Sequence, residues 1–434
     1  MAVKIVREEI RERIERIRRN EVPEGYKYTE IGIIPRNWKL YLLREIIKKI
    51  ETGASVNSDN TIEADNYILK TSAIKNGKFY PQESKGVIQS EVHRLRCPVV
   101  EGSIIVSRMN TPQLVGETGY IDKSLNNIYL PDRLWQLYNG LPDICDFKWL
   151  NYLLASNQYR CILHKRATGT SNSMKNISKD EFLSITIPLP EKKEQGKIVE
   201  VLSVMDKAIQ CIEEIIKEKE KQKKYLFQNL LTGKKRLSDC DGEWRVVKLG
   251  ELFQERVEIN CENEELLAIT GFGIIPRYEI DAKDNSSEDK SKYKKIYVGD
   301  IGYNTMRMWQ GVSAYSDYEG IVSPAYTILK PSDNIYAKFF AYLFKLPFCI
   351  NLFYRYSQGL VNDTLNLKYS NFKKIKVNIP IDKEEQKAIA RILESADKEI
   401  VLLEQQLQNY KREKQSIMQL LLTGIVRVTE LDRI

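Results

Sequence analysis

The 434-residue sequence predicts an α+β fold in which two similar globular domains are separated by two long helices that pair as an antiparallel coiled coil, giving a pseudo-twofold repeat. Three observations predict it. One long segment occurs twice without a gap, each copy carries a regular apolar stripe, and the regions before the two copies share the same landmarks. A repeat of this kind determines the architecture, so it is considered before any shorter motif.

The duplicated segment begins at Glu194 and again at Glu385. Its identities include Glu194-Gln195 with Glu385-Gln386, Asp206-Lys207 with Asp397-Lys398, and Leu230-Leu231-Thr232-Gly233 with Leu421-Leu422-Thr423-Gly424. Chance does not usually produce so many matches in one register. We therefore interpret the segment as a true internal repeat.

Each copy carries apolar residues at alternating spacings of four and three, which form a continuous seam on a helix that a partner helix must cover. The predicted pairing residues are Ile198, Leu202, Ile209, Ile212, Ile216 and Leu226 in the first copy, and Ile389, Leu393, Ile400, Leu403, Leu407 and Ile417 in the second. Lys219 and Lys223 interrupt the first seam, and Lys414 interrupts the second. Each helix should be about 50–55 Å long at about 1.5 Å per residue. The alternative is that each helix lies on its own domain.

The regions before the helices also correspond, so the chain divides into five parts. These are an N-terminal amphipathic helix and linker (1–27), a first domain (28–190), a first spacer helix (191–235), a second domain (236–380), and a second spacer helix with a C-terminal tail (381–434). A turn that leads into a short strand is expected at both 102–109 and 299–306. Matching helical runs are expected at 149–154 and 339–344, and matching strands stopped by proline at 185–190 and 375–380. Between these landmarks the two domains share little, as expected of two readers of different ligands.

The composition argues against several classes of protein. The seven cysteines are scattered without a Cys-x-x-Cys pair, and His93 and His164 are the only histidines, so neither a zinc site nor a disulfide framework is expected. No apolar run reaches the roughly 20 residues that cross a bilayer, and the N-terminus is charged throughout, unlike a signal peptide. We therefore expect a cytoplasmic protein without a membrane partner. The net charge of +8 is compatible with a polyanionic partner but does not require one.

In its repeat, its helix seams and its domain landmarks, the chain resembles the specificity (S) subunits of type I restriction–modification systems over essentially its whole length. The order and duplication of the motifs carry the resemblance. They are Tyr28-Thr29-Glu30-Ile31-Gly32-x-x-Pro35-x-x-Trp38, the Pro-x-x-x-Glu-Gln start of the first helix at Pro190–Gln195, the two Leu-Leu-Thr-Gly ends, and Asn304–Gly311. One departure is that Pro380 to Glu385 is one residue longer than Pro190 to Glu194.

The resemblance implies two target recognition domains, each reading one half of a split, asymmetric site in double-stranded DNA. It implies that the helices are a conserved spacer on which methyltransferase (M) subunits dock, two of them in our expectation, and that restriction (R) subunits join to form the nuclease. S-adenosylmethionine would bind M, and ATP with Mg²⁺ would bind R, so this chain would be non-catalytic and carry no cofactor.

Independently of the resemblance, two separated readers should meet successive exposures of the major groove, about 34 Å apart. Because the two domains differ in sequence, the site should not be palindromic.

The candidate DNA-contacting residues are polar side chains in glycine-bearing or strand-terminal loops, where base edges and phosphates are commonly read. In the first domain they are Ser72, Lys75, Asn76, Lys78, Arg108, Asn110, Thr170, Ser171, Asn172 and Lys175; in the second they are Arg307, Trp309, Gln310, Arg355, Gln358 and Asn362, with a further loop at Thr270–Gly273. The alternative is ordinary surface loops, which use the same residue types.

Two charged or amphipathic segments are more ambiguous. The run Lys290–Lys295 could hold phosphate, or it could be a solvated face. Residues 3–19 form a predicted amphipathic helix with Val6, Ile10, Ile14 and Ile17 on one side. That apolar side requires a partner, which could be the long helices, an M subunit or the helix's own domain.

Two other functions are alternatives to DNA recognition. A metal-dependent nuclease would use Pro131-Asp132 with Asp146-Phe147-Lys148, the one match to the usual carboxylate pattern, whose halves flank an expected loop. The second domain has no counterpart of this pattern, and the chain lacks both the glycine-rich loop and the Asn/Asp-Pro-Pro-aromatic motif of a methyltransferase. A purely structural coiled-coil scaffold would not need two large, divergent globular domains.

Overall fold

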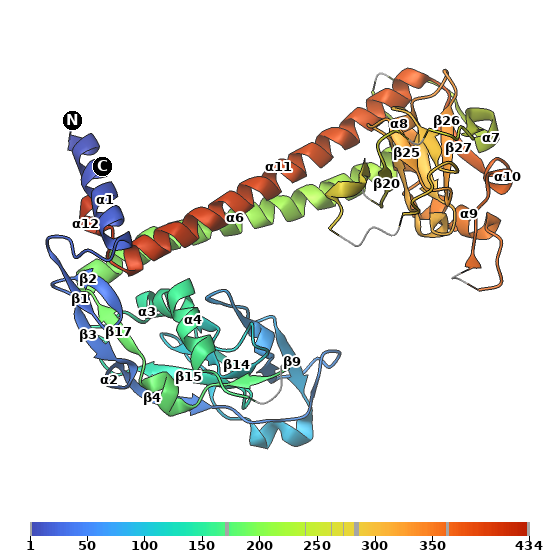
Figure 1. Ribbon diagram of the computed structural model, residues 1–434. Coiled ribbons are helices and arrows are strands. Elements are labelled where there is room, and N and C mark those ends of the chain that lie inside the picture. Colours follow the sequence, from blue (N-terminus) through green and yellow to red (C-terminus); the bar gives the residue numbers. More distant parts are fainter. Residues whose placement is uncertain are drawn as a thin grey trace. The chain divides into compact units, whose positions relative to one another are not determined.

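The structure, a computed structural model, describes residues 2–169, 173–238, 240–261, 263–271, 273–281, 286–361 and 364–431. The chain forms two compact units. The first contains residues up to Cys211 together with those from Leu407 onward, and the second contains Ile212–Gln406. Each unit therefore holds one globular domain, half of the first long helix and half of the second (Figure 1).

The first domain is a mixture of short strands and helices. In chain order its elements are α1 (Ala2–Arg18), β1 (Tyr26–Thr29), β2 (Gly32–Pro35), β3 (Lys39–Leu42), α2 (Leu43–Ile46), β4 (Ile47–Thr52), β5 (Ser58–Asp59), β6 (Tyr67–Leu69), β7 (Ile74–Lys75), β8 (Lys78–Phe79), β9 (Ser84–Val87), β10 (Pro98–Val99), β11 (Ile104–Ser107), β12 (Met109–Asn110), β13 (Thr118–Tyr120), β14 (Leu125–Tyr129), β15 (Leu134–Asn139), α3 (Phe147–Ala155), α4 (Asn157–Arg166), β16 (Lys175–Asn176), α5 (Lys179–Leu183) and β17 (Thr186–Leu189).

The central sheet of the first domain is antiparallel, with strand order β13-β11-β15-β4. A second sheet, β10-β14-β6-β9-β5, lies beside it, and strand β17 pairs with β3 just before the first long helix begins. Helices α3, α4 and α5 bury Trp149, Tyr159 and Phe182 against the central sheet residue Trp135. This core continues into Ile198 and Leu202 of the first long helix and into the last turns of the second.

The second domain repeats this plan with different details. Its elements are β18 (Trp244–Lys248), α7 (Leu249–Leu252), β19 (Phe253–Arg256), β20 (Leu267–Ile269), β21 (Ile274–Pro276), β22 (Lys294–Ile296), β23 (Ile301–Asn304), the 3-10 turn η4 (Met308–Gln310), β24 (Ser313–Tyr315), β25 (Gly320–Val322), β26 (Tyr326–Pro331), α8 (Ala337–Leu343), α9 (Pro347–Tyr356), α10 (Tyr369–Phe372) and β27 (Lys376–Pro380). Its sheet has the order β19-β26-β23-β24, and β18 pairs with β27 as β3 pairs with β17.

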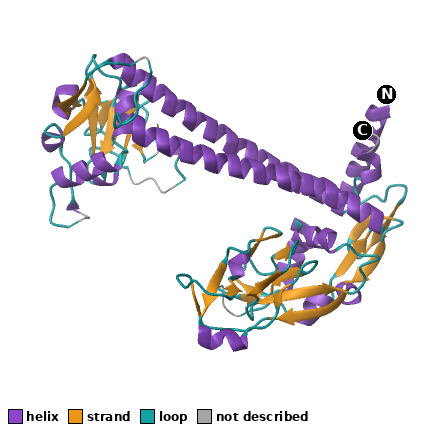
Figure 2. Cartoon of the chain, turned by 180° about the vertical axis from the view of Figure 1, so that it is seen from behind, coloured by secondary structure: helices purple, strands orange, loops and turns teal. Residues whose placement is uncertain are grey.

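Aromatic rings fill the core of the second domain. Phe253 meets Phe340 edge to face at a centroid distance of 5.1 Å, and Phe344 packs edge-on against both Phe353 and Phe372. Such pairs stabilise a core beyond the burial of their area. The cluster continues into the end of the first long helix and the start of the second. In Figure 2 each domain combines strands and helices, and the predicted α+β class is confirmed.

The two long helices are α6 (Lys192–Leu230) and α11 (Lys383–Leu422), followed by the short helix α12 (Val428–Leu431). They pair as predicted: the N-terminal half of α6 lies with the C-terminal half of α11 in the first unit, and the reverse holds in the second, so the pairing is antiparallel. Of the predicted seam, Ile198, Leu202, Ile209, Ile212, Ile389, Leu393, Ile400 and Leu407 are buried, and Ile216, Leu226, Leu403 and Ile417 are half-buried.

The lysines that interrupt the seam form ion pairs across it. Lys219 lies 2.6 Å from Glu399 and Lys223 pairs with Asp397, both within the second unit. Within the first unit, Lys414 lies 2.9 Å from Asp206. The helices thus stay paired through the polar stretch, where long lysine stems can cover the apolar surface while their charged ends meet carboxylates.

Helix α1 lies against the C-terminal segment of the first unit. Ile10 packs on the core that contains Val426 and Val428, and Arg13 forms a bidentate ion pair with Glu430 at 2.7 and 3.0 Å. The apolar side of the predicted N-terminal helix is therefore covered at Ile10 by the chain's own C-terminal end. Among the helices that the structure describes, none is both long and apolar enough to cross a membrane.

Replacing Leu202 by alanine should lower the free energy of unfolding by about 2–5 kcal/mol, because its fully buried side chain joins α6 to the first domain and its loss leaves a cavity. Val204, which is 62% exposed on the same helix, provides the control. Val204→Ala should stay within about 0.5 kcal/mol. Urea unfolding followed by tryptophan fluorescence measures both, and equal effects would contradict the packing described.

Candidate nucleic-acid interface

In the first domain, strand pairing brings two of the predicted loops together. Strand β12, which begins immediately after Arg108, pairs with β16, so that Asn110 lies opposite Lys175. The Arg108 guanidinium donates to the carbonyl of Asp132 at 2.8 Å and to the Asn176 amide oxygen at 3.4 Å. Lys175 Nζ donates to the carbonyl of Gly169 at 2.9 Å. The predicted residues Thr170, Ser171 and Asn172, which come between these segments, lie outside the described residues.

Asn110 is turned inward. It is 8% exposed, its amide nitrogen donates to Ser107 Oγ at 3.1 Å, and its amide oxygen accepts the Thr111 N–H at 2.8 Å. Those bonds shape the turn and leave Asn110 little capacity for base contact in this conformation. Arg108 and Lys175 are half-buried, each with part of its donor set still available.

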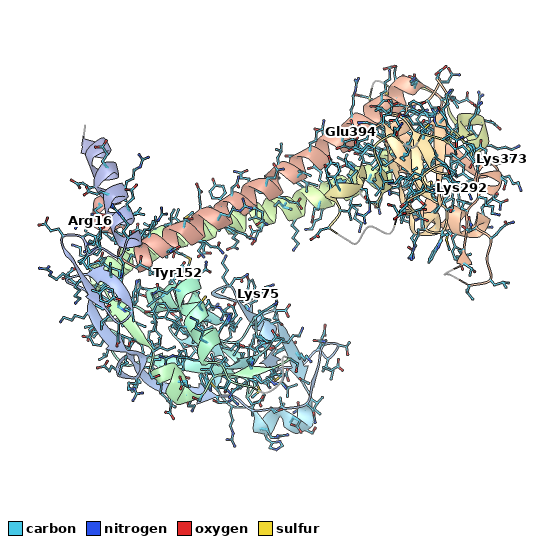
Figure 3. The ribbon with its side chains drawn as sticks, viewed as in Figure 1. Arg16, Lys75, Tyr152, Lys292, Lys373 and Glu394 are labelled. Atoms are coloured by element: carbon cyan, nitrogen blue, oxygen red, sulfur yellow. The ribbon has the colours of Figure 1, made fainter. Side chains whose placement is uncertain are left out.

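The other predicted segment of the first domain is the β7–β8 hairpin. Asn76 and Gly77 form its turn with φ of 55° and 75°, a left-handed geometry typical of two-residue hairpins. Lys75 and Asn76 are exposed, and Figure 3 shows Lys75 on this hairpin. Lys78 lies 3.1 Å from Asp206 of α6, and Ser72 donates to Glu83 at 2.8 Å. The structure therefore places Lys78 against the spacer helix.

In the second domain the predicted segments meet around η4 and α9. The Trp309 indole donates to the carbonyl of Met306 at 2.9 Å, and its ring packs edge-on against Tyr354 at 6.2 Å. Arg355 follows on α9, and Gln358 pairs with Asn366 in an isolated bridge. Arg307, Gln310, Arg355 and Gln358 are exposed and Trp309 is half-buried. Asn362 lies outside the described residues.

The loop at Thr270–Gly273 joins the same face through Lys345. The Lys345 ammonium donates to the carbonyls of Gly271 (3.1 Å), Gly311 (2.7 Å) and Ser313 (2.6 Å). Burial lowers the pKa of Lys345 to about 8. Sequence reasoning did not identify this lysine, because nothing in its local pattern indicates that it reaches three carbonyl oxygens.

The lysine run at Lys290–Lys295 divides into two parts. Lys295 is buried between Glu264 (2.5 Å) and Glu319 (3.0 Å), and Lys294 donates to the carbonyl of Tyr326 at 2.7 Å. Lys292, labelled in Figure 3, is exposed. The end of the run is therefore part of the fold, and only its earlier portion could meet phosphate.

The carboxylates of the nuclease pattern are not assembled into a metal centre. Both strand β15 and the turn segment after it, residues 140–146, lie between Asp132 and Asp146, so the expectation of a loop alone was wrong. Asp146 is the N-cap of α3 and accepts the Lys148 and Trp149 N–H groups at 2.7 and 3.2 Å. Lys148 pairs with Asp122. Within the described ranges, no group of three or more His, Cys, Asp or Glu side chains is arranged to hold a metal ion.

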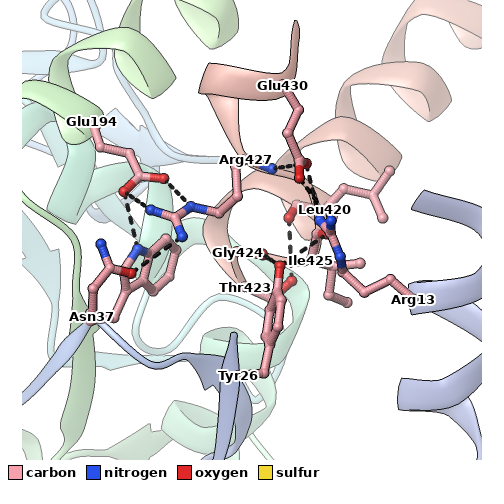
Figure 4. A network of polar contacts seen from close by, with 11 residues as sticks. Arg13, Tyr26, Asn37, Glu194, Leu420, Thr423, Gly424, Ile425, Arg427 and Glu430 are labelled. Atoms are coloured by element: carbon pink, nitrogen blue, oxygen red, sulfur yellow. Dashed lines mark hydrogen bonds and ion pairs between the residues drawn. The ribbon is translucent and has the colours of Figure 1, made fainter. Parts of the chain in front are cut away.

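A buried carboxylate at the start of each long helix joins it to the end of the other helix and to its domain. The Glu194 carboxylate accepts two hydrogen bonds from the Arg427 guanidinium, at 2.6 and 2.8 Å, and one from the Trp38 indole N–H at 3.1 Å (Figure 4). In the second unit, the Glu385 carboxylate accepts two hydrogen bonds from the Arg236 guanidinium, at 2.8 and 2.9 Å, and one from the Trp244 indole N–H at 3.1 Å. We call these two trios the carboxylate clasps. The residues of one trio match those of the other in the repeat.

The neighbouring glutamines explain the rest of the helix-start motif. Gln195 accepts the Asp146 N–H at 2.7 Å and donates to the carbonyl of Pro190 at 2.8 Å. Gln386 does the same with the Tyr336 N–H (2.8 Å) and the carbonyl of Pro380 (2.9 Å). Both are buried, so an amide that donates and accepts satisfies backbone groups that would otherwise be unpaired.

The repeated aspartates form a second pair of matching contacts. Tyr152 donates to Asp206 at 2.8 Å in the first unit, and Tyr342 donates to Asp397 at 2.6 Å in the second. Burial raises the pKa of Asp206, but Lys414, Lys78 and the Tyr152 hydroxyl outweigh it and hold that pKa below its ordinary value. The signal was visible in the sequence as Asp206 and Asp397 at matching positions, yet their tyrosine partners on α3 and α8 could not be assigned from periodicity.

Comparison with known proteins now decides the family. A family model described as "Type I restriction modification DNA specificity domain" matches the chain twice, over residues 35–228 and 241–410. The chain belongs to this family. Both matches include one domain and most of one long helix, so the predicted resemblance and the internal repeat are confirmed together.

Individual relatives agree with this assignment. A curated protein of Methanocaldococcus jannaschii, named as the MjaX specificity subunit of a type I restriction enzyme, is 24% identical over 93% of this chain and 97% of its own length. The type I restriction enzyme EcoEI specificity subunit of Escherichia coli is 24% identical over 39% of this chain and 29% of its own length. The solved S subunit of a type I restriction–modification system from M. genitalium shares the fold, with a TM-score of 0.56 and 17% identity over 89% of this chain and 96% of that one.

Replacing Asp206 by asparagine should lower stability by on the order of 1–3 kcal/mol near neutral pH, because Lys414 loses its partner. The pKa of Asp206 is depressed in the folded state, so its contribution is present above the unfolded pKa and disappears as the pH falls through the folded pKa. The difference between wild type and variant should therefore shrink on acidification below about pH 4. Thermal unfolding across pH measures it, with Glu220→Gln on the exposed face of α6 as control. A difference independent of pH would rule out this origin.

Proposed function

We propose that this chain is the DNA-specificity subunit of a type I restriction–modification complex, in which each domain reads one half of a split, asymmetric DNA site. The observation that supports it most is the combination of one frame with two different sets of loops. Both domains carry the same strand pair and clasp at the start of a long helix, whereas the segments after β11 and β23 differ in length and residues. Two readers with different loops recognise two different half-sites.

The helix pair then sets the distance between the half-sites. Each domain core is continuous with the start of one helix and the end of the other, so each domain is attached to the helix pair through packed side chains as well as through the chain itself. Binding on one side of B-DNA requires half-sites separated by about one helical turn or a multiple of it. Helices of fixed length therefore favour a gap of fixed length.

We further propose that two M subunits dock on the helices and that R subunits complete the complex in the cytoplasm. Several large apolar side chains of α6 and α11 remain exposed, and exposed apolar surface is typical of protein interfaces. They are Val204, Ile215, Tyr225, Val401 and Leu402. S-adenosylmethionine would bind the M subunits, and ATP with Mg²⁺ the R subunits, so this chain would supply recognition without catalysis.

Co-expression with a type I methyltransferase (M) subunit from the same genome, followed by genome-wide mapping of methylated adenines, tests the proposal. We expect one split, asymmetric motif with a fixed gap. Exchange of residues 28–190 should then change one half of the motif, and exchange of residues 241–380 the other. A stable complex whose methylation is absent or unsplit would contradict the two-reader model and favour a scaffold.

Arg307→Ala and Arg355→Ala should each weaken recognition at one half-site only, because both arginines lie exposed on the second domain's candidate face. A lost base contact costs about 1–3 kcal/mol, or roughly 5–150-fold in affinity. Lys292→Ala is the comparison: if Lys292 holds phosphate, it should weaken binding to all sequences alike and reduce the salt slope by about one. Binding titrations of the complex at several salt concentrations measure both effects. No change for either arginine would remove this face from the interface.

A further inference from the structure

In each domain, one cation binds the backbone of the loop that follows the central strand. Arg160 of α4 donates to the carbonyls of Gln113 and Val115, each at 2.9 Å. In the second domain, Lys345 donates to the carbonyls of Gly311 and Ser313 and also to Gly271 of a neighbouring loop. These are the loops that contain the predicted readers Arg108 and Arg307.

The two loops occupy corresponding places in the fold. One connects β11 to β13, and the other connects β23 to β24. Each contains a glycine with left-handed backbone, Gly116 (φ 76°) and Gly311 (φ 81°). A Cβ at these glycines would come within 2.9 Å of Leu163 on α4 and 3.0 Å of Ile350 on α9. Both loops are therefore pressed against the helix behind them at the point where the cation binds.

Arg160 and Lys345 bind the loop carbonyls from different positions in the fold and with different functional groups. Arg160 lies within α4, whereas Lys345 lies between α8 and α9. Arg160 also pairs with Glu117 at 3.1 Å, with side-chain exposures of only 12% and 8%. The sequence repeat does not align these residues. The same loop is thus held by an arginine–carboxylate pair in one domain and by a lysine in the other.

Holding the carbonyls has two physical consequences for a loop that faces DNA. A charged donor with several backbone acceptors fixes the orientation of the peptide planes, so less conformational entropy is lost on binding. The positive charge on the donor also offsets the partial negative charge of the carbonyl oxygens, which reduces their repulsion of phosphate oxygens. Both effects act on how the loop presents its side chains, although neither Arg160 nor Lys345 need touch a base.

We propose that Arg160 and Lys345 are positioning residues for base recognition, each fixing the backbone of one readout loop, so that loss of either changes base discrimination in one half-site only. The assignment of these loops as readers rests on the function proposed above. The holding of the loops does not, since it is a property of the free protein. The two parts can be tested separately.

The test variant is Lys345→Met, which removes the charged amino group and keeps an unbranched side chain that is only one atom shorter. Lys338→Met is the matched control, because Lys338 is a neighbouring half-buried lysine of α8 that pairs with Glu394 (2.9 Å) and Asp317 (3.5 Å), and not with a loop carbonyl. In the first domain, Arg160→Met is combined with Glu117→Gln, because removal of the arginine alone would leave a buried carboxylate unpaired.

Hydrogen exchange of the full-length free chain measures the holding of the loop. In Lys345→Met, amides of residues 305–313 should exchange about tenfold faster, as expected for the net loss of one or two hydrogen bonds, while β23 and β26 stay protected. Lys338→Met should leave the loop unchanged. Unchanged exchange in Lys345→Met would overturn the proposal, whatever is found with DNA.

Methylation mapping of the complex with its methyltransferase measures recognition. Lys345→Met should relax base preference in one half of the motif, and the Arg160→Met/Glu117→Gln variant in the other, with the gap unchanged. If the loop loosens but both halves keep their discrimination, the proposed positioning role is wrong while the specificity function stands. If the wild-type complex itself shows no split motif, the specificity function fails before any variant is compared.

Discussion

The buried carboxylate at the start of each long helix is the interaction on which the arrangement of each unit depends. Glu194 and Glu385 are 9% and 1% exposed. A carboxylate buried to this degree is costly unless it is paired and hydrogen-bonded. Its position in the first turn favours it through the helix dipole, but the decisive partners come from elsewhere in the chain. The arginine comes from just beyond the end of the opposite helix, and the indole comes from the first strand region of the domain.

Each clasp joins the start of one long helix, the segment just after the end of the other, and the first strand region of the domain. It therefore fixes the register in which the two helices pair. If α11 were shifted along α6 by one heptad, Arg427 could not reach Glu194, and the buried carboxylate would be unpaired. The ion pairs within the seam act in the same direction. Lys414 with Asp206 and Lys223 with Asp397 would also be separated by such a shift. Apolar seams alone tolerate sliding, because isoleucine and leucine pack adequately in several registers, whereas polar groups in the seam specify one.

The sequence was sufficient to predict the architecture because the architecture is periodic and duplicated. The seam residues are visible as spacings of four and three, and Leu202 and Leu393 are fully buried as that pattern requires. The contacts of the aspartates were not predictable in the same way. Asp206 is recognisable as a repeated residue, but its partners Tyr152 and Lys78 come from a helix and a hairpin whose side-chain directions depend on the folded domain.

The same limit applies to the candidate interface. Composition identified loops that contain Arg, Lys and Asn, yet it could not distinguish side chains that face outward from those that bond locally. Asn110 satisfies its amide within its own turn, and Lys78 meets a carboxylate on α6, whereas Arg307 and Arg355 remain exposed. Short polar side chains in turns compete for nearby backbone groups. Their orientation is therefore decided by local geometry, which residue type alone does not determine.

On the function proposed above, the separation of a shared frame from variable loops lets one architecture read different recognition sites. The two cores are formed mainly by the sheets, by α3–α5 or α8–α10, and by the ends of the long helices, and the loops after β11 and β23 add the buried side chains Val115 and Met308. Substitutions there change the exposed side chains without moving the clasps or the seam. One buried side chain alone leaves the rest of a loop free to change its backbone conformation, however, and a loop with several conformations discriminates poorly between bases. A cation that reaches the loop from the helix behind it resolves this conflict, because it orders the backbone without constraining the outward side chains. Arginine in one domain and lysine in the other, at positions that do not match, indicate that the requirement is for a donor to those carbonyls rather than for a particular residue.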